Sequence, residues 1–191
     1  LETLQESRLG TTRHLVSALA TLTKPPSVLV NASAVGYFGT SSDQRFEESS
    51  PAGADFLARL CQQWEQAAAE KPAATRLVVL RIGIVLSSEG GALAKMLPVF
   101  RAGFGGPIGS GQQWMSWIER GDLCRIIQSS LESESWSGVI NAVAPDPVTM
   151  AVFAGSLGRC LGRPSLLAVP GPMLQLLLGD GSKVVLEGQF V

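Results

Sequence analysis

The strongest strand signal in the chain is Leu77-Val78-Val79-Leu80-Arg81-Ile82-Gly83-Ile84-Val85-Leu86. A continuous apolar run rich in β-branched residues predicts a strand that is buried on both faces, as in parallel sheets. Arg81 interrupts the run and needs a partner, because an unpaired charge inside a protein is costly. That partner is either an internal carboxylate or an anionic ligand. One arginine and one glycine within an apolar strand are typical of a strand whose C-terminal end meets a site.

Helical and extended patterns alternate on both sides of this run. Apolar residues at helical spacing predict helices at residues 2–22, 56–70, 92–101, 121–131, 148–161 and 171–178. Short apolar runs predict strands at residues 27–33, 112–118 and 138–143. Because helices alternate with strands and smaller mixed pieces follow, the order predicts an α/β parallel sheet with an appended lobe.

The composition indicates a globular protein with a buried core. Of the 191 residues, 46% are apolar and only 16% are charged. These values exclude disorder, which requires low hydrophobicity and high charge. Fifteen basic and sixteen acidic residues give a net charge of −1. Without a basic excess, neither a nucleic acid nor an anionic membrane surface is an expected partner.

The cysteines, the histidine and the first residue bear on compartment and completeness. Cys61, Cys124 and Cys160 are odd in number and far apart, which fits reduced thiols rather than a disulfide framework. With His14 as the only histidine, we expect no metal site. No apolar stretch reaches membrane-spanning length, so we expect no span. We expect a cytoplasmic protein, or a plastid protein if a transit peptide precedes residue 1. Since the chain starts with Leu1 rather than Met, we expect a fragment.

Polar and glycine-rich positions near the predicted strand ends are candidates for a site. Ser33 closes a predicted strand, where it either holds a ligand hydroxyl or only satisfies backbone groups of the turn. Tyr37, the only tyrosine, either faces a substrate or plugs its loop against the sheet. The glycine-rich loop 103–111, followed by Trp114 and Trp117, either lines a pocket or forms a lid between lobes.

A set of short stretches, in a fixed order, resembles one protein family over nearly the whole chain. These stretches are residues 7–12, 31–39, 80–86, 90–92, 105–111, 117–122, 141–145 and 186–189. The most specific of them is Gly105-Gly106-Pro107-Ile108-Gly109-Ser110-Gly111. In this combination the chain resembles the extended short-chain dehydrogenase/reductase superfamily and, within it, the atypical epimerase-like family.

The resemblance implies a more definite fold and domain division. The fold it implies is a Rossmann-like parallel sheet with helices on both faces, plus a smaller C-terminal α+β lobe. Residues 1–145 would form the C-terminal part of an NAD(P)-binding domain, with a lobe insertion near residues 88–120. Residues 146–191 would form part of a substrate lobe. The family's glycine-rich dinucleotide fingerprint does not occur in this chain, so the resemblance places it before residue 1.

The superfamily's catalytic pattern is only partly present. Its members transfer hydride with a Tyr phenol as acid and base, a Lys four residues further on, and a Ser that positions the substrate oxygen. Ser33 matches that serine. Two registers are open for the helix that follows, in which the Tyr and Lys positions hold either Leu57 and Cys61 or Phe56 and Leu60. Neither register supplies a proton donor or a cation, which leaves Tyr37 as the only stand-in.

The resemblance also implies the site residues and the cofactor. Ser33 and Tyr37 are the implied catalytic residues, and the implied cofactor contacts are Arg8, Ser33, Arg81 and Val85. An arginine suits a 2′-phosphate, so Arg8 favours NADP over NAD.

Two functions remain open from the sequence. The first is an NADP-binding oxidoreductase or epimerase-like protein that acts on a small-molecule substrate. The alternative is a catalytically inert, dinucleotide-binding regulator that acts through protein contacts, for example in plastid or bacterial division. The missing Tyr–Lys pair favours the regulator, and the retained loops of the cleft favour the enzyme. A homodimer is compatible with both.

Overall fold

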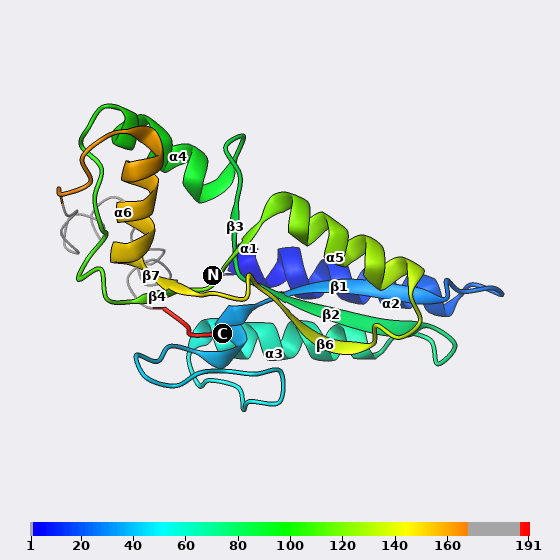
Figure 1. The fold of residues 1–191 in the computed structure, drawn as a ribbon. Coiled ribbons are helices and arrows are strands. Elements are labelled where there is room, and N and C mark those ends of the chain that lie inside the picture. Colours follow the sequence, from blue (N-terminus) through cyan, green and yellow to red (C-terminus); the bar gives the residue numbers. More distant parts are fainter. Residues whose placement is uncertain (1, 168–187) are drawn as a thin grey trace. The chain divides into compact units, whose positions relative to one another are not determined.

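The computed structural model describes residues 2–167 and 188–191 of the chain (Figure 1). The chain divides into two compact units. The first, called here the sheet unit, comprises Leu1–Gly39, Glu47–Ile82 and Gly121–Ala142. The second, called here the mixed unit, comprises Thr40–Phe46, Gly83–Arg120 and Val143–Val191.

The sheet unit is built on three parallel strands. They are β1 (Val28–Ala34), β2 (Arg76–Ile82) and β6 (Gly138–Ala142), in the order β1-β2-β6. The register aligns Ser33 with Arg81, and Arg81 with Asn141. The centre of β2 is almost fully buried, as the apolar run predicts. The predicted strands at residues 27–33 and 138–143 are therefore confirmed.

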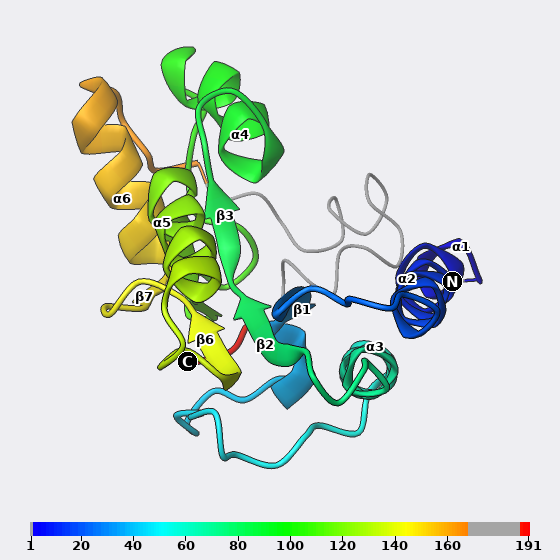
Figure 2. The same cartoon turned by 90° about the vertical axis from the view of Figure 1, so that its right-hand side faces the viewer.

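Helices cover both faces of this sheet. The N-terminal helical stretch consists of α1 (Glu2–Gln5), the π-helical turn η1 (Glu6–Gly10) and α2 (Thr11–Ala20). Together with α3 (Phe56–Ala69), α2 lies on one side of the sheet, and α5 (Arg120–Glu132) lies on the other (Figures 1 and 2). The N-cap of α3 is Asp55, whose carboxylate accepts from the backbone N–H of Ala58 at 2.8 Å. These helices confirm the predicted ones at residues 2–22, 56–70 and 121–131, within one or two residues at each end.

The predicted strand at residues 77–86 is wrong in one respect, because it breaks at Gly83. The chain continues as β3 (Ile84–Leu86), which pairs in parallel with β5 (Trp117–Glu119) of the mixed unit. The Ile84 N–H donates to the carbonyl of Ser116 at 2.8 Å, and a Cβ on Gly83 would lie 2.6 Å from that same oxygen. Only glycine allows this close approach of two backbones.

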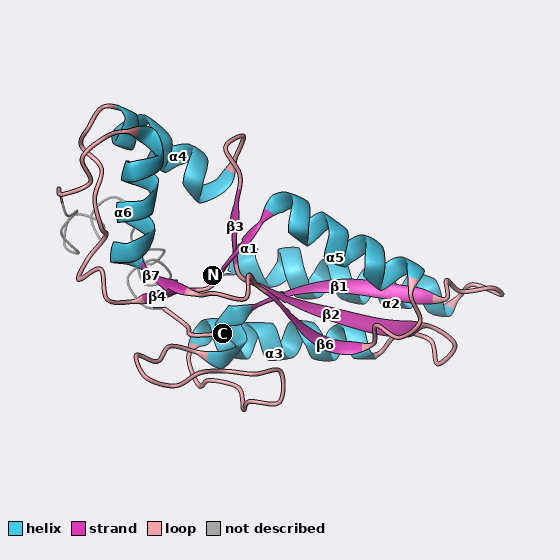
Figure 3. Cartoon of the chain, viewed as in Figure 1, coloured by secondary structure: helices cyan, strands magenta, loops and turns pink. Residues whose placement is uncertain are grey.

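The mixed unit is assembled from short elements (Figure 3). Besides β3 and β5 it contains the antiparallel pair β4 (Trp114–Met115) and β7 (Val148–Thr149), and the helices α4 (Gly91–Arg101) and α6 (Met150–Leu161). The predicted strand at residues 112–118 is thus split at Ser116 into β4 and β5. The predicted helices at residues 92–101 and 148–161 are confirmed, and the one at 171–178 lies outside the described residues.

The fold class is confirmed as α/β, with a parallel sheet between two layers of helices. The assignment of residues 1–145 and 146–191 to a cofactor domain and a substrate lobe stays a prediction. Among residues 2–167 and 188–191, no helix has the length and apolarity needed to cross a membrane.

Candidate functional site

Three side chains of the sheet unit meet at the C-terminal end of β1 and β2. Ser33 and Arg81 are register partners on adjacent parallel strands, so their side chains stand on the same face. From α3, Glu65 reaches between them. Its carboxylate accepts from Arg81 Nε and Nη2, each at 2.9 Å, and from Ser33 Oγ at 2.6 Å. Three hydrogen bonds thus join the side chains of this Ser33–Glu65–Arg81 cluster.

The cluster is shielded from water. The side chains of Arg81 and Glu65 are only 4% and 13% exposed, and Ser33 is 3% exposed. A two-pronged arginine–carboxylate contact is the strongest geometry for such a pair. Of the two partners that the sequence left open for Arg81, the internal carboxylate is confirmed.

Tyr37 contacts the same arginine. It lies on η2 (Val35–Phe38), the 3₁₀ turn that follows β1. The guanidinium carbon of Arg81 is 3.3 Å from the centroid of the Tyr37 ring, and Phe38 packs edge-on against that ring at 5.4 Å. The ring is half-buried, and it packs its loop against a strand residue, which was one of the two roles expected for Tyr37.

Cys61 extends the cluster on the side of α3. Burial raises the pKa of its thiol above the ordinary value of 9.0, although hydrogen bonds from the Ala34 backbone and the Ser33 side chain act in the opposite direction. The thiol therefore stays protonated at neutral pH. One turn earlier on the helix, Leu57 faces the backbone of Gly36, with 3.8 Å between its Cβ and the ideal Cβ position there. Neither residue supplies an acid or a cation, in line with the sequence.

Arg8 is a cation with spare donors. Its guanidinium lies 5.5 Å from the centre of the Trp64 ring and, within residues 2–167 and 188–191, donates only to the carbonyl of Leu4 and the hydroxyl of Ser7. Within the described residues it has no carboxylate within ion-pair distance. Its charge also acts on the Cys61 thiol, which places it within electrostatic reach of the cluster. An arginine without an acidic partner fits an anionic ligand.

Val85 and the two tryptophans belong to the mixed unit. Val85 is half-buried on β3 and aligns with Ile118 on β5. Trp114 stacks on Phe190 with 4.3 Å between ring centroids, and Trp117 lies on β5. The structure thus links Ser33 and Arg81 through Glu65, stacks Arg81 against Tyr37, and places Val85 in the other unit.

Glu65, Cys61 and Glu48 are cluster residues that the sequence did not identify as partners of Arg81 or Ser33. Glu48 joins through its backbone carbonyl, which accepts from Arg81 Nη1 at 3.1 Å, and through its carboxylate, which accepts from the Asn141 N–H at 2.9 Å. A usable signal existed for Glu65, because a buried arginine requires a carboxylate and this residue is one of only two acids in the predicted helix 56–70.

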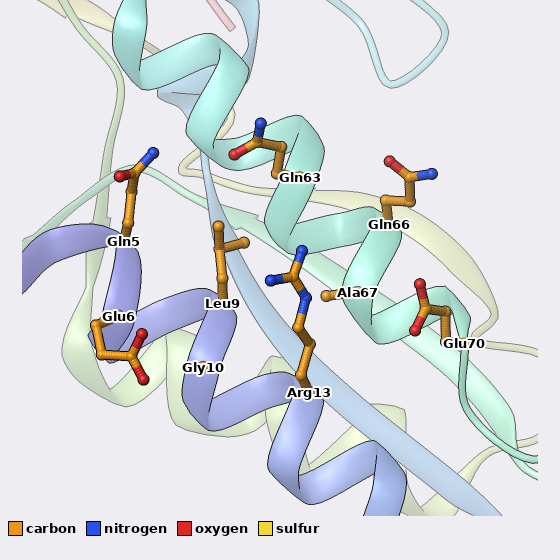
Figure 4. A pocket seen from close by; sticks show the side chains of 9 residues that line it. All are labelled: Gln5, Glu6, Leu9, Gly10, Arg13, Gln63, Gln66, Ala67 and Glu70. Carbon is orange, nitrogen blue, oxygen red and sulfur yellow. The ribbon is translucent and has the colours of Figure 1, made fainter. Parts of the chain in front are cut away.

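A separate pocket of about 500 Å³ opens between the N-terminal helices and α3 (Figure 4). Arg13 projects from α2 toward α3 across its floor, beside Leu9 and Ala67. The remaining lining is mostly amide and carboxylate groups, from Gln5, Glu6, Gln63, Gln66 and Glu70. No predicted site residue lines this pocket, and its two acids offset its one arginine. The Ser33–Glu65–Arg81 cluster is therefore the better candidate for the functional site.

Comparison with known proteins identifies relatives of the chain. No family model matches it. It is 51% identical over 166 residues to the chloroplastic epimerase family protein SDR39U1 homolog of Arabidopsis thaliana. The matched region covers 87% of this chain and 48% of that protein. It is 42% identical over 187 residues to epimerase family protein SDR39U1 of Mus musculus, covering 97% of this chain and 64% of the relative.

Solved structures give the same answer. The crystal structure of human epimerase family protein SDR39U1 with NADPH matches the whole chain with a TM-score of 0.95 and 41% identity, and the chain covers 67% of it. The chain thus spans about half to two thirds of the length of these relatives. Given these identities and this coverage, the chain belongs to the atypical, epimerase-like short-chain dehydrogenase/reductase family of SDR39U1.

Proposed function

We propose that the complete gene product is an NADP-binding, epimerase-like oxidoreductase that acts on a small-molecule substrate. The observation that carries the proposal is the human relative, which was crystallised with NADPH and superposes on the whole of this chain with a TM-score of 0.95. NAD is the less favoured cofactor. Residues 1–145 would contribute to the cofactor domain and residues 146–191 to the substrate lobe.

The proposed roles follow from what each residue has to offer. Arg8 has spare guanidinium donors and would bind the 2′-phosphate that distinguishes NADP from NAD. Ser33 and Val85 would border the cofactor, and Ser33 and Tyr37 would lie near the reacting carbon of the substrate. Arg81, for which the family resemblance implied the same contact, is buried against Glu65 and would act on the site from behind Ser33. Bound NADP would supply the hydride acceptor or donor, and these residues would orient the reactants.

A calorimetric titration of the complete gene product with NADPH and with NADH tests the cofactor proposal. Arg8→Ala should weaken NADPH binding by about tenfold or more, as expected for losing a hydrogen bond to a charged group, and change NADH binding far less. Arg13→Ala is the matched control, because it removes an arginine from the same helical stretch. Equal losses for both cofactors in Arg8→Ala would rule out the 2′-phosphate role.

The second candidate is a catalytically inert, dinucleotide-binding regulator that acts through protein contacts, for example in plastid or bacterial division. What favours it is the direction of the Ser33 hydroxyl. That hydroxyl donates its proton to Glu65, so it has none to give to a substrate carbonyl, and Leu57 and Cys61 supply no acid or cation nearby. NADPH consumption over a panel of carbonyl compounds separates the two functions. Turnover by wild type that Tyr37→Phe abolishes supports the enzyme, whereas no turnover supports the regulator.

Assembly and location complete the proposal. We propose a homodimer in the cytoplasm, or in the plastid if a transit peptide precedes residue 1; the Arabidopsis relative is named as chloroplastic. Sedimentation of the complete gene product, and localisation of a fluorescent fusion, test the two statements.

A further inference from the structure

Arg81 is linked to both residues that are proposed to act in catalysis, to Ser33 through Glu65 and to Tyr37 directly. The edge of its guanidinium forms a two-pronged contact with Glu65, whose carboxylate also receives the Ser33 hydroxyl at 2.6 Å. The carbon of the same guanidinium lies 3.3 Å from the centroid of the Tyr37 ring, which is so close that the flat face of the guanidinium must lie over the ring. The hydrogen-bonding edge of a guanidinium and its flat face are perpendicular. One rigid planar group therefore sets both the orientation of the Glu65 carboxylate and the position of the Tyr37 ring.

The backbone holds this arginine in place. Arg81 lies within β2 between two hydrogen-bonded neighbours, β1 and β6, and the third hydrogen bond of its side chain goes to the backbone carbonyl of Glu48 at 3.1 Å. Ser33 lies near the end of β1, and Tyr37 lies in the 3₁₀ turn after that strand. A side chain anchored in a central strand is a more rigid support than a loop.

The contacts in the Ser33–Glu65–Arg81 cluster fix which groups donate hydrogen bonds and which accept them. The Glu65 carboxylate already receives two guanidinium N–H groups, so it can only accept, and the Ser33 hydroxyl must donate to it. The serine oxygen keeps its lone pairs for other groups. Arg81 thereby determines the orientation of the Ser33 hydroxyl without touching it.

We propose that Arg81 is the positioning residue of the site. It fixes the direction of the Ser33 hydroxyl through Glu65, and it fixes the Tyr37 ring through the face of its guanidinium. This inference rests on the proposed function for the roles of Ser33 and Tyr37. It replaces direct cofactor contact as the reason for an arginine at this place, since the side chain is only 4% exposed.

Fluorine NMR of the complete gene product labelled with 3-fluorotyrosine tests the proposal, with the Tyr37 signal assigned by its loss in Tyr37→Phe. Arg81→Lys keeps the charge but removes the planar face and the two-pronged contact, so the Tyr37 signal should move and broaden. Glu65→Gln should do the same by releasing the guanidinium. Arg76→Lys is the matched control, because it makes the same change on the same strand, in a guanidinium that donates to the carbonyls of Ser130 and Trp136.

NADPH is the probe that tests whether Arg81 acts in the proposed function. Addition of NADPH to wild type and to Arg76→Lys should shift the Tyr37 signal, and this shift should be lost in Arg81→Lys while calorimetric NADPH affinity changes less than about threefold. A Tyr37 signal at its wild-type position in folded Arg81→Lys, with its NADPH shift retained, would overturn the proposal. A loss of NADPH affinity of about tenfold or more would also overturn it, in favour of direct cofactor contact.

Further measurements cover two other outcomes, namely variants that do not fold and a wild-type protein that binds no NADPH. If Arg81→Lys and Glu65→Gln do not fold, NMR of the wild-type protein tests the proposal instead. We expect a nuclear Overhauser effect between the Arg81 guanidinium protons and the Tyr37 ring, and its absence would overturn the proposal. If wild type binds no NADPH, the proposed function fails, whereas the Tyr37 signals of the ligand-free variants still show whether Arg81 holds this ring.

Discussion

Two arginine–glutamate pairs, one in each compact unit, have the same chemistry and different surroundings. In the sheet unit, the side chains of Arg81 and Glu65 are 4% and 13% exposed. In the mixed unit, those of Arg120 and Glu89 are 52% and 71% exposed. A buried pair loses its hydration, so each partner depends on the other, whereas water solvates and screens an exposed pair. Burial, and not residue type, therefore determines how much each pair matters.

The buried pair also has a consequence that the exposed one lacks. Because water cannot take the place of a missing partner, the pair holds its geometry, and it passes that geometry on to Ser33 and Tyr37. The ion pair of Arg120 and Glu89 lies on the surface, where water solvates both groups. This contrast is the reason for placing the candidate site at the first pair.

Removal of one partner of the buried pair should have the largest effect. We expect Glu65→Met or Arg81→Met to lower the free energy of unfolding by about 3–5 kcal/mol, since each leaves a buried charge unpaired. The double variant should recover much of this loss, because two apolar side chains need no hydration. Urea unfolding of all three proteins measures both effects. Single variants no less stable than Arg120→Met would contradict the contrast between the two pairs.

The Cys61 thiol should make the sheet unit sensitive to alkali, with a smaller effect. Burial raises its pKa above 9.0 in the folded protein. Below 9.0 both states keep the proton and the contribution to stability is complete; as the pH rises further, the unfolded chain ionises first, and stability is lost up to the folded pKa. Urea unfolding at increasing pH should show this decline in wild type.

Variants at two cysteines separate this effect from general alkaline unfolding. Cys61→Ala should flatten the decline, while Cys124→Ala, at an exposed cysteine, should retain it. An identical pH dependence in all three proteins would show that the buried thiol is not its source.

Neutralisation of the exposed pair should have the smallest effect. The hydrogen bond and the charge of Arg120 lower the pKa of Glu89 below the ordinary value of 4.5. A lowered pKa stabilises the fold above 4.5 and loses that contribution as the pH falls through the folded pKa. Because the Glu89 side chain is 71% exposed, we expect Glu89→Gln to leave the urea midpoint at neutral pH unchanged within error, at low and at high salt. A shift of the urea midpoint as large as that of Glu65→Met would show that the exposed pair matters as much as the buried pair.

Much of the sheet unit could be predicted from local patterns. The run from Leu77 to Ile82 is apolar and β-branched, and it forms the central strand. Asp55 before a helical pattern marks the start of α3, whose capping contact it makes. The resemblance to the epimerase-like family, based on ordered motifs, also agrees with the relatives that the chain matches.

Other features could not be predicted, because they depend on contacts between distant segments. The break at Gly83 arises from the carbonyl of Ser116, 33 positions further along the chain. The choice of Glu65 as partner of Arg81 depends on how α3 is rotated over the sheet. The position of the Tyr37 ring on the Arg81 guanidinium depends on the path of the 3₁₀ turn after β1.

Composition and periodicity were enough to predict an α/β fold with a parallel sheet, because the burial of apolar strands and helix faces leaves a direct trace in the order of residues. They also showed that Arg81 needs a partner, since the cost of a buried charge is independent of the fold. Only packing in three dimensions decides that Glu65 is the carboxylate partner of Arg81. The same packing decides that the Arg81 guanidinium contacts Tyr37 and orients Ser33 through Glu65. Hydrogen bonds act over about 3 Å, and side chains more than 30 positions apart in the chain are brought that close only by the fold.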